Sequence, residues 1–206
     1  EGFTIRQVSP EELKTNAFKT GFQANLETRE ILISMAIQSA SLRFQLASIY
    51  AEHRYGQLIS SLCRNAQRLT NEGGKKQGLK ALRSYLAGAI LYPYDTFLSA
   101  ARALRYDIDM LAQQFGGSFE QICHRLVTLR GAGREGVPFA FMRTDLAGNI
   151  SKRFNIPGLR LPRYGSACPL WAIYRSSLNP GRILAQAVEL PEGDQYLLVA
   201  STVRKE

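Results

Sequence analysis

Apolar residues in the first 130 positions recur at intervals of three and four, the spacing of helices that bury one face. From Leu26 to Leu69 the chain contains no proline and one glycine, Gly56, so we expect a long helical region there. A second helix is predicted over Leu79 to Leu91, because the residue before Pro93 is displaced from helical geometry. The N-terminal part is therefore expected to be helical.

Capping signals mark the ends of further helices in this part. Ser9-Pro10-Glu11-Glu12 is a capping box with proline at the first helical position, and Asn71 to Lys76 is a polar break that contains glycine. Asp107 is suited to begin a helix that Gly116-Gly117 ends. Ser118 to Gln121 is a second capping box, which begins the next helix.

A helix, a glycine turn and another helix are also the outline of a helix-turn-helix motif. In a DNA-binding motif the second helix, expected here over Phe119 to Leu129, would enter the major groove. Its polar positions include only His124 and Arg125 as basic residues, which is few for contacts with phosphates. A structural role of this helix pair is favoured over DNA recognition.

The apolar period changes from helical to two after Gly133. Alternating apolar residues begin at Val137, and Asp145 to Asn149 forms a turn into a strand over Ile150 to Phe154. A strong hairpin signal follows near the C-terminus, where two strands flank a turn. These strands are expected over Arg182 to Leu190 and Gln195 to Val203, with Ala185, Val188, Leu190, Leu197 and Val199 as candidate core residues.

The predicted fold class is α+β, with a helical part followed by a small, mostly antiparallel β-sheet part. We place the boundary so that residues 1–130 form a helical ligand-pocket domain and residues 131–206 a small β-rich domain. No apolar run reaches the roughly 20 residues that a membrane-spanning helix needs, so no membrane partner is expected.

The basic residues are concentrated in the second part. The net charge of the chain is +9, and the stretch from Arg143 to Arg182 has seven basic residues against one acid, Asp145. This excess predicts an anionic partner, either nucleic acid or a phosphorylated small molecule; a solvated basic face is the alternative. Aromatic residues interleave the basic ones, as in sites that hold phosphates and stack on a base. The candidate ligand-binding residues here are Arg143, Lys152, Arg153, Arg163, Trp171 and Arg175.

Two further candidates lie in the helical part. Arg43 stands in its most apolar helix, where a buried guanidinium needs a partner, either Glu27, Glu30 or Glu52, or a ligand. Tyr94 follows Pro93 at a helix end and has a hydroxyl to offer to a pocket, although a tyrosine that only closes the core is the alternative.

The three cysteines, Cys63, Cys123 and Cys168, are an odd and widely spaced set, which indicates a reducing cytoplasm and not a disulfide framework. Cys168 lies among basic and aromatic residues that would lower the pKa of its thiol, so it is a candidate metal ligand or reactive group, and inert packing is the alternative. No HExxH motif and no nucleophile–base pair is present, so we do not expect an enzyme.

Several runs of residues resemble the C-terminal region of short-chain fatty acyl-CoA-responsive transcriptional regulators, which are helix-turn-helix regulators of the xenobiotic-response-element type that control propionate (methylcitrate) and glyoxylate metabolism. The runs are Arg105 to Asp109, Ser118 to Leu126, Gly136 to Phe139, Gly148 to Phe154 and Cys168 to Trp171. In addition, Leu82 to Tyr94 resembles the helix after the active site in zinc peptidase-like domains of toxin–antitoxin and radiation-response regulators. The resemblance extends from about Ile31 to Arg204.

This resemblance implies a cytoplasmic ligand-sensing domain of a homo-oligomeric transcription regulator. It would bind propionyl-CoA or a similar short-chain acyl-CoA as effector, and control promoter DNA binding by an N-terminal domain that this chain lacks. Lys152, Arg153 and Arg163 are then the first phosphate contacts, Arg143 and Arg175 further ones, and Trp171 the residue that stacks on the adenine. Arg43 and Tyr94 would serve the acyl end.

Two departures from the family pattern qualify this expectation. The peptidase-like relatives have HExxH on a preceding helix, where this chain has only His53, so the peptidase-like part is interpreted as degenerate. Tail cysteines of propionate-type members are associated with an iron–sulfur cluster, and Cys168 would be a ligand of a 4Fe–4S cluster only in the full-length protein. The alternative functions are a degenerate zinc peptidase-like or acyl-CoA-processing enzyme, and a direct nucleic-acid-binding module.

Overall fold

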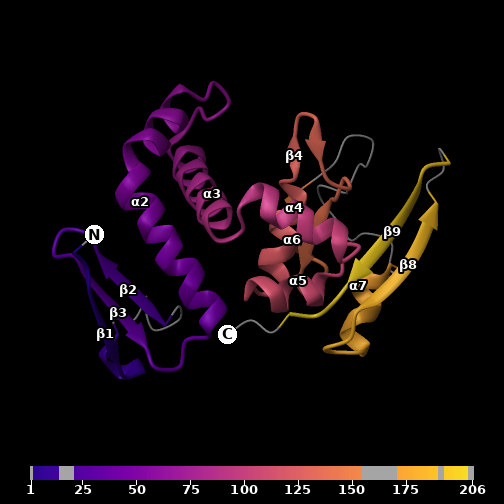
Figure 1. The fold of residues 1–206 in the computed structure, drawn as a ribbon, viewed down its shortest axis with the longest axis horizontal. Helices are drawn as coiled ribbons and strands as arrows, with labels where there is room; N and C mark the ends of the chain where they lie inside the picture. Colours follow the sequence, from indigo (N-terminus) through magenta and orange to yellow (C-terminus); the bar gives the residue numbers. More distant parts are fainter. Residues whose placement is uncertain (1, 14–20, 155–170, 190–192, 204–206) are drawn as a thin grey trace. The chain divides into compact units, whose positions relative to one another are not determined.

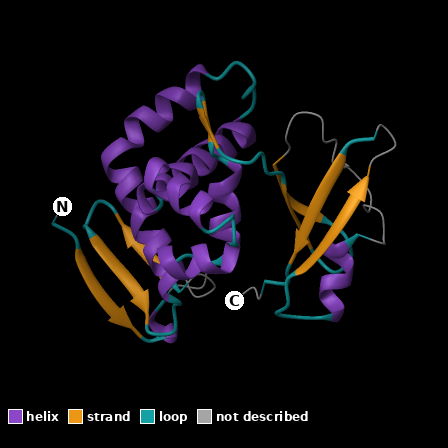
Figure 2. Ribbon diagram, turned by 45° about the vertical axis from the view of Figure 1, so that its right-hand side comes forward, coloured by secondary structure: helices purple, strands orange, loops and turns teal. Residues whose placement is uncertain are grey.

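The computed structural model describes residues 2–13, 21–154, 171–189 and 193–203 (Figure 1). It divides into two compact units, Glu1–Arg125 and Leu126–Lys205. The first unit contains a small sheet and a group of helices, and the second contains strand pairs and one short helix (Figure 2). The α+β class predicted from the sequence is confirmed, with helices and a small sheet in the first unit and small antiparallel sheets in the second.

The first unit begins with a three-stranded sheet that the sequence reasoning missed. Its strands are β1 (Thr4–Val8), β2 (Phe22–Asn25) and β3 (Glu30–Ser34), in the order β1-β3-β2, with β1 parallel and β2 antiparallel to β3. The expectation of helix from Leu26 onward is therefore wrong for β3. Ile31 and Ile33 are buried on alternate positions, and β-branched residues in a short apolar run favour a strand over a helix. The capping box before it begins only a short turn, η1 (Pro10–Glu12).

Two long helices, α2 (Ser39–Asn65) and α3 (Glu72–Leu91), pack against each other after this sheet (Figure 1). The polar segment before Leu79 is not a break, because α3 already begins at Glu72. The Asn71 side chain accepts a hydrogen bond of 2.6 Å from the Gly74 N–H. Asn71 is therefore the N-cap residue of α3, and this cap compensates for the low helix propensity of the two glycines in the first turn. The predicted end of α3 before Pro93 is confirmed.

Three shorter helices, α4 (Tyr94–Ala103), α5 (Ile108–Phe115) and α6 (Phe119–Val127), complete the helical part. Asp107 caps α5 by accepting a hydrogen bond of 2.9 Å from the Met110 N–H. In the predicted capping box, the Ser118 N–H donates to the Gln121 side chain (3.0 Å) and the Gln121 N–H donates to the Ser118 hydroxyl (3.3 Å). Both caps were predicted from the sequence and are confirmed.

An aromatic cluster forms the core beneath these helices. The rings of Phe97 and Phe115 lie 5.0 Å apart between centroids, and the Tyr92 ring lies 5.8 Å from Phe97 and 6.1 Å from Phe115. Tyr92 and Phe97 are buried, as are Leu111 and Ile122. Because Tyr92 is the C-cap residue of α3 and its ring contacts Phe97 of α4 and Phe115 of α5, this cluster ties the shorter helices to the end of α3.

The second unit consists of antiparallel strand pairs: β4 (Arg130–Gly131) with β5 (Arg134–Glu135), β6 (Phe141–Thr144) with β7 (Ile150–Phe154), and β8 (Leu184–Glu189) with β9 (Gln195–Ala200). The short helix α7 (Ala172–Arg175) and the turn η2 (Ser176–Leu178) precede β8. The predicted strand after the Asp145 turn and the predicted C-terminal hairpin are both confirmed. Within the described residues, no helix is both long and apolar enough to span a bilayer.

One face of the β8–β9 pair packs against α7, and the other face is exposed. The Ala172 N–H donates a hydrogen bond of 2.7 Å to the Gln186 side chain, so the face that carries even-numbered residues is the inner one. The prediction that Ala185, Leu197 and Val199 belong to the core is wrong, since all three are exposed, Leu197 by 69% and Val199 by 43%. Leu190, from the same prediction, lies outside the described residues. Strand β9 is apolar on both faces, so alternation alone did not identify the inner one.

We expect the turn between α5 and α6 to require glycine at position 117. A Cβ atom on Gly117 would lie 2.5 Å from the Tyr92 hydroxyl oxygen and 3.2 Å from Ile122 Cδ1. Gly117→Ala should therefore lower the free energy of unfolding by about 1–3 kcal/mol, measured by urea denaturation.

The Tyr92→Phe background provides the control for this prediction. Because it removes the hydroxyl oxygen nearest to the added methyl group, Gly117→Ala should cost less there than in the wild type, and the two effects should not add. Equal costs in both backgrounds would contradict the close approach as the cause.

Candidate ligand-binding site

The candidate ligand-binding residues predicted from the sequence lie in both units of the structure. Arg43 and Tyr94 belong to α2 and α4 of the first unit. The second unit holds the larger group, namely Arg143, Lys152, Arg153, Trp171 and Arg175. Arg163 and Cys168 lie outside the described residues.

Arg43 is exposed. The hydrogen bonds of its Nη1 go to backbone carbonyls and not to the glutamates considered in the sequence analysis. Its Nη1 donates hydrogen bonds to the carbonyl oxygens of Phe115 (2.8 Å) and Gly116 (3.2 Å) at the end of α5. A guanidinium there also interacts favourably with the negative end of the helix dipole. The expectation of a buried Arg43 is corrected, because this position of α2 faces the α5–α6 turn and not the core.

Tyr92 and Gln121 form a hydrogen-bond network beside that turn. The Tyr92 hydroxyl donates to Gln121 Oε1 (3.0 Å), which also accepts from the Ser118 N–H, and Gln121 Nε2 donates to the Ala40 carbonyl (3.3 Å). Burial raises the pKa of Tyr92, and the charge of Arg43 opposes that rise. The network links the start of α2 to the start of α6.

Arg125 is a buried cation that the sequence reasoning left among surface positions. Its side chain is 4% exposed, its Nε donates a hydrogen bond of 2.8 Å to the Tyr92 carbonyl, and its guanidinium carbon lies 5.6 Å from the centre of the Tyr94 ring. Burial lowers the pKa of Arg125, and a hydrogen bond with the Tyr85 side chain opposes this effect. Tyr94 therefore provides a ring face for Arg125, a contact between α4 and α6 with no local sequence signal.

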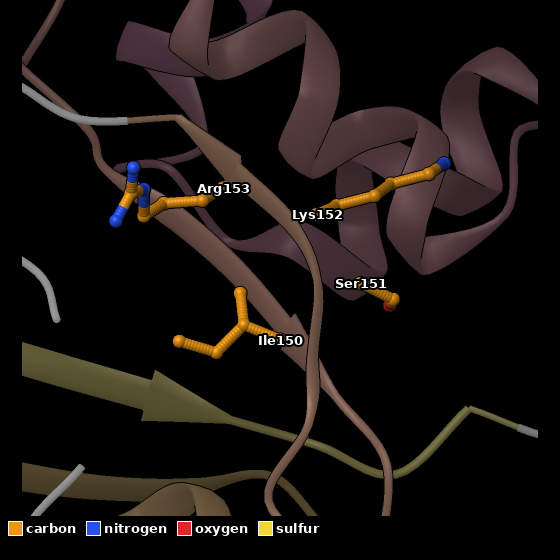
Figure 3. A pocket seen from close by; sticks show the side chains of 4 residues that line it. All are labelled: Ile150, Ser151, Lys152 and Arg153. Atoms are coloured by element: carbon orange, nitrogen blue, oxygen red, sulfur yellow. The ribbon is translucent and has the colours of Figure 1, made fainter. Parts of the chain in front are cut away.

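The β6–β7 hairpin brings Arg143 and Lys152 to the same face. The two residues are opposite each other in the register, with an irregularity between Arg143 and Thr144. Because of this bulge, Ser151 and Lys152 leave β7 on the same side, as Figure 3 shows, and Arg143 Nε donates a hydrogen bond of 2.8 Å to the Ser151 hydroxyl. Two cationic side chains thus share one short stretch of the hairpin.

Arg153 points to the other side of the hairpin, together with Ile150 (Figure 3). The four residues from Ile150 to Arg153 line an open hollow of about 180 Å³. The sequence grouped Lys152 with Arg153 as neighbouring phosphate contacts, but adjacent strand residues face opposite ways, so the structure groups Lys152 with Arg143 instead.

Trp171 and Arg175 lie at the two ends of α7 in the same unit. Trp171 is the N-cap residue of this helix and is partly exposed, and Arg175 is exposed at its last position.

The described residues do not form a metal centre. Among them, no three His, Cys, Asp or Glu side chains gather closely enough to hold a metal ion. His53 packs its ring against Phe3, 5.3 Å between centroids, and Glu52 forms an ion pair with Arg83. Burial, followed by the charge of Glu120, raises the pKa of the Cys123 thiol to about 12. A protonated thiol is a poor metal ligand, so Cys123 is not suited to hold a metal ion.

Comparison with known proteins assigns a family to each half of the chain. Residues 11–127 match the IrrE N-terminal-like domain, and residues 128–206 match the family described as short-chain fatty acyl coenzyme A regulator, C-terminal. The boundary between the two matches lies within three residues of the boundary between the two units.

Individual relatives are similar over most of this chain but are much longer. The chain is 39% identical over 85% of its length to "HTH-type transcriptional regulator PrpR" of Mycobacterium tuberculosis, and 40% identical over 87% to "Propionyl-CoA carboxylase regulator" of Cereibacter sphaeroides. It spans 36% and 39% of those proteins. A solved structure, "Mycobacterium tuberculosis transcriptional regulator", matches 96% of this chain and 59% of its own at a TM-score of 0.87 and 35% identity.

We expect Arg43→Ala to destabilise the first unit, because it removes the hydrogen bonds to the last carbonyls of α5. The expected loss is about 1 kcal/mol of unfolding free energy, measured in urea. Arg64→Ala, an exposed arginine in the last turn of the same helix, is the matched control and should change stability by less than about 0.5 kcal/mol. Similar losses in the two variants would contradict a specific role of Arg43.

Cys123 should remain unreactive in the folded protein, because the thiolate is the reacting species and its pKa is raised to about 12. Iodoacetamide at pH 8 should label Cys123 slowly in the native protein and rapidly in urea, as measured by mass spectrometry of its peptide. Native labelling at the rate seen in urea would show that the thiol is neither buried nor protonated.

Proposed function

This chain belongs to the short-chain fatty acyl coenzyme A regulator family, and on that premise we propose that it is the effector-binding part of a transcription regulator that responds to propionyl-CoA or a similar short-chain acyl-CoA. The membership confirms the resemblance on which the sequence-based expectation rested. The relatives are named as regulators of transcription or of propionyl-CoA carboxylase, in agreement with the expectation that this chain is not an enzyme.

The observation that carries the proposal is the pair of cations on the β6–β7 hairpin. Coenzyme A carries a diphosphate and a further phosphate on its ribose, so a site for it needs cationic groups that act together. Arg143 and Lys152 are opposite each other on neighbouring strands, within the region that matches the regulator family. Charge-assisted hydrogen bonds from such a pair to a phosphate are stronger than those of neutral donors.

The remaining candidates have less support from the described contacts than this pair has. Arg153 lies on the other side of the same strand and lines the hollow beside it. Arg175, Trp171 and Arg163 stay predictions as further contacts in the same unit. Tyr94 and Arg43 stay predictions for the acyl end. The case for Arg43 as a ligand contact is weaker, because its Nη1 already donates hydrogen bonds to two carbonyls.

Several features of the whole regulator extend beyond this chain. DNA binding through an N-terminal domain, homo-oligomer formation and a cytoplasmic location are part of the proposal, and they are supported by relatives that are named as HTH-type transcriptional regulators. A 4Fe–4S cluster has no support from the described residues, whose two cysteines, Cys63 and Cys123, are separate and largely buried.

Calorimetric titration with propionyl-CoA tests the proposal. We expect binding by the wild type, and a loss of about ten- to a hundredfold in affinity for Arg143→Ala and for Lys152→Ala, because each removes a charged hydrogen-bond donor. Arg134→Ala, on the β4–β5 hairpin of the same unit, changes the net charge equally and should leave the affinity within about threefold.

Three results would contradict the proposal. Absence of binding to acetyl-CoA, propionyl-CoA and butyryl-CoA by the wild type would remove the sensing function. Equal losses in Arg134→Ala and in the two hairpin variants would indicate a general charge effect and not a site. Tight binding of single-stranded nucleic acid, with a steep salt dependence and no response to acyl-CoA, would favour the nucleic-acid-binding alternative.

A further inference from the structure

Two phenylalanine rings lie on the same face of the β6–β7 hairpin as its paired cations. Phe141 is opposite Phe154 in the register, and their ring centroids are 6.3 Å apart, so the two rings are on one side. Phe141 and Arg143 are two positions apart on β6, and Lys152 and Phe154 are two positions apart on β7. Because alternate residues of a strand share a face, all four side chains belong to the same face.

This face is part of the accessible surface of the hairpin. The Phe154 side chain is 41% exposed, which is high for a large aromatic residue in a strand, and Phe141 supports it from the neighbouring strand at partial burial. Aromatic rings that remain accessible on a β-sheet face provide platforms on which a planar group stacks. The ring therefore offers a second kind of recognition next to the two cations.

The combination of ring and cations at this spacing is the chemistry that recognises a purine nucleotide. Two residues along a strand span about 7 Å. In a nucleotide, one ribose separates the base from the phosphate, a span of similar size. Phe154 thus supplies a stacking surface at one position of β7, and Lys152 supplies a phosphate contact two residues before it.

We propose that the Phe154 ring, backed by Phe141, is the stacking platform for the adenine base of the effector, while Lys152 and Arg143 hold its phosphate groups. This inference rests on the proposed function, and it assigns the base to the β6–β7 face and not to Trp171. Trp171 is the N-cap of α7, on a different element from the paired cations. Phe154 shares their strand pair and their face.

The effector can be divided into halves that test the platform separately. Adenosine 3′,5′-bisphosphate carries the base and a phosphate pair without the acyl arm, and propionyl-pantetheine carries the acyl arm without the nucleotide. Phe154→Leu keeps an apolar side chain but removes the ring. We expect it to weaken propionyl-CoA and the bisphosphate by about tenfold in calorimetry, since a base stacked on an aromatic residue contributes about 1–3 kcal/mol. The affinity for propionyl-pantetheine should not change.

Two further variants separate stacking from a general loss of structure. Phe154→Trp keeps a stacking ring and should retain the affinity of the wild type for the bisphosphate, with quenching of the new indole fluorescence by the bound base. Leu146→Ala, in the turn of the same hairpin, removes a side chain that is 87% exposed and should leave all three affinities unchanged. The melting temperatures of all variants show whether the fold is intact.

Failure of this inference is distinct from failure of the proposed function. If Phe154→Leu binds propionyl-CoA and the bisphosphate as tightly as the wild type, the platform is overturned while acyl-CoA sensing stands. An equal loss for propionyl-pantetheine also overturns it, because the ring would then serve the acyl arm. Absence of any acyl-CoA binding by the wild type overturns the function itself. Binding of an adenylate oligonucleotide far more tightly than the bisphosphate, in a Phe154-dependent manner, would assign the platform to nucleic acid instead.

Discussion

The helical unit depends on the close approach that the two glycines between α5 and α6 permit. At this turn the chain has no side-chain atoms, so Arg43 from α2 and Tyr92 from the end of α3 reach the backbone of residues 115–117 directly. Gly116 also has a φ of 62°, which an L-residue adopts only at a cost. The turn is therefore the point where the long helices and the short ones are joined.

That junction makes the polar residues of this unit mutually dependent. Gln121 accepts a hydrogen bond from the Tyr92 hydroxyl and caps α6, and the Tyr92 carbonyl accepts from Arg125. Arg125 in turn lies against the Tyr94 ring. A substitution at one of these positions is expected to affect the neighbours, since buried polar groups that lose a partner destabilise more than the bond itself contributes.

In the second unit, cationic and aromatic side chains lie together on a small strand pair, β6–β7. A two-stranded pair has two faces and little core, so its side chains are only partly covered. Regular antiparallel pairing places Arg143 opposite Lys152 and Phe141 opposite Phe154, so these four side chains share one face, and Arg153 lies on the other. The bulge after Arg143 adds Ser151 to the side of Lys152, where its hydroxyl accepts a hydrogen bond from Arg143.

The sequence alone predicted those features that depend on residues near each other in the chain. The caps at Asp107 and Ser118, the end of α3 before Pro93, the C-terminal hairpin and the basic character of residues 143–182 are all local properties. Family-specific runs of residues also identified the family, because a motif of consecutive residues is recognised in the sequence without the structure.

Long-range pairing decided what the sequence did not. The strand β3 pairs with β2 in a local hairpin but also with β1, which lies more than twenty residues earlier in the chain. Arg43 bonds to two carbonyls because α5 ends beside it. The burial of Arg125, the outward face of Leu197 and the grouping of Lys152 with Arg143 likewise depend on partners in other elements. Propensity and periodicity describe how a segment prefers to fold, whereas the face that it buries is set by which other segments pack against it.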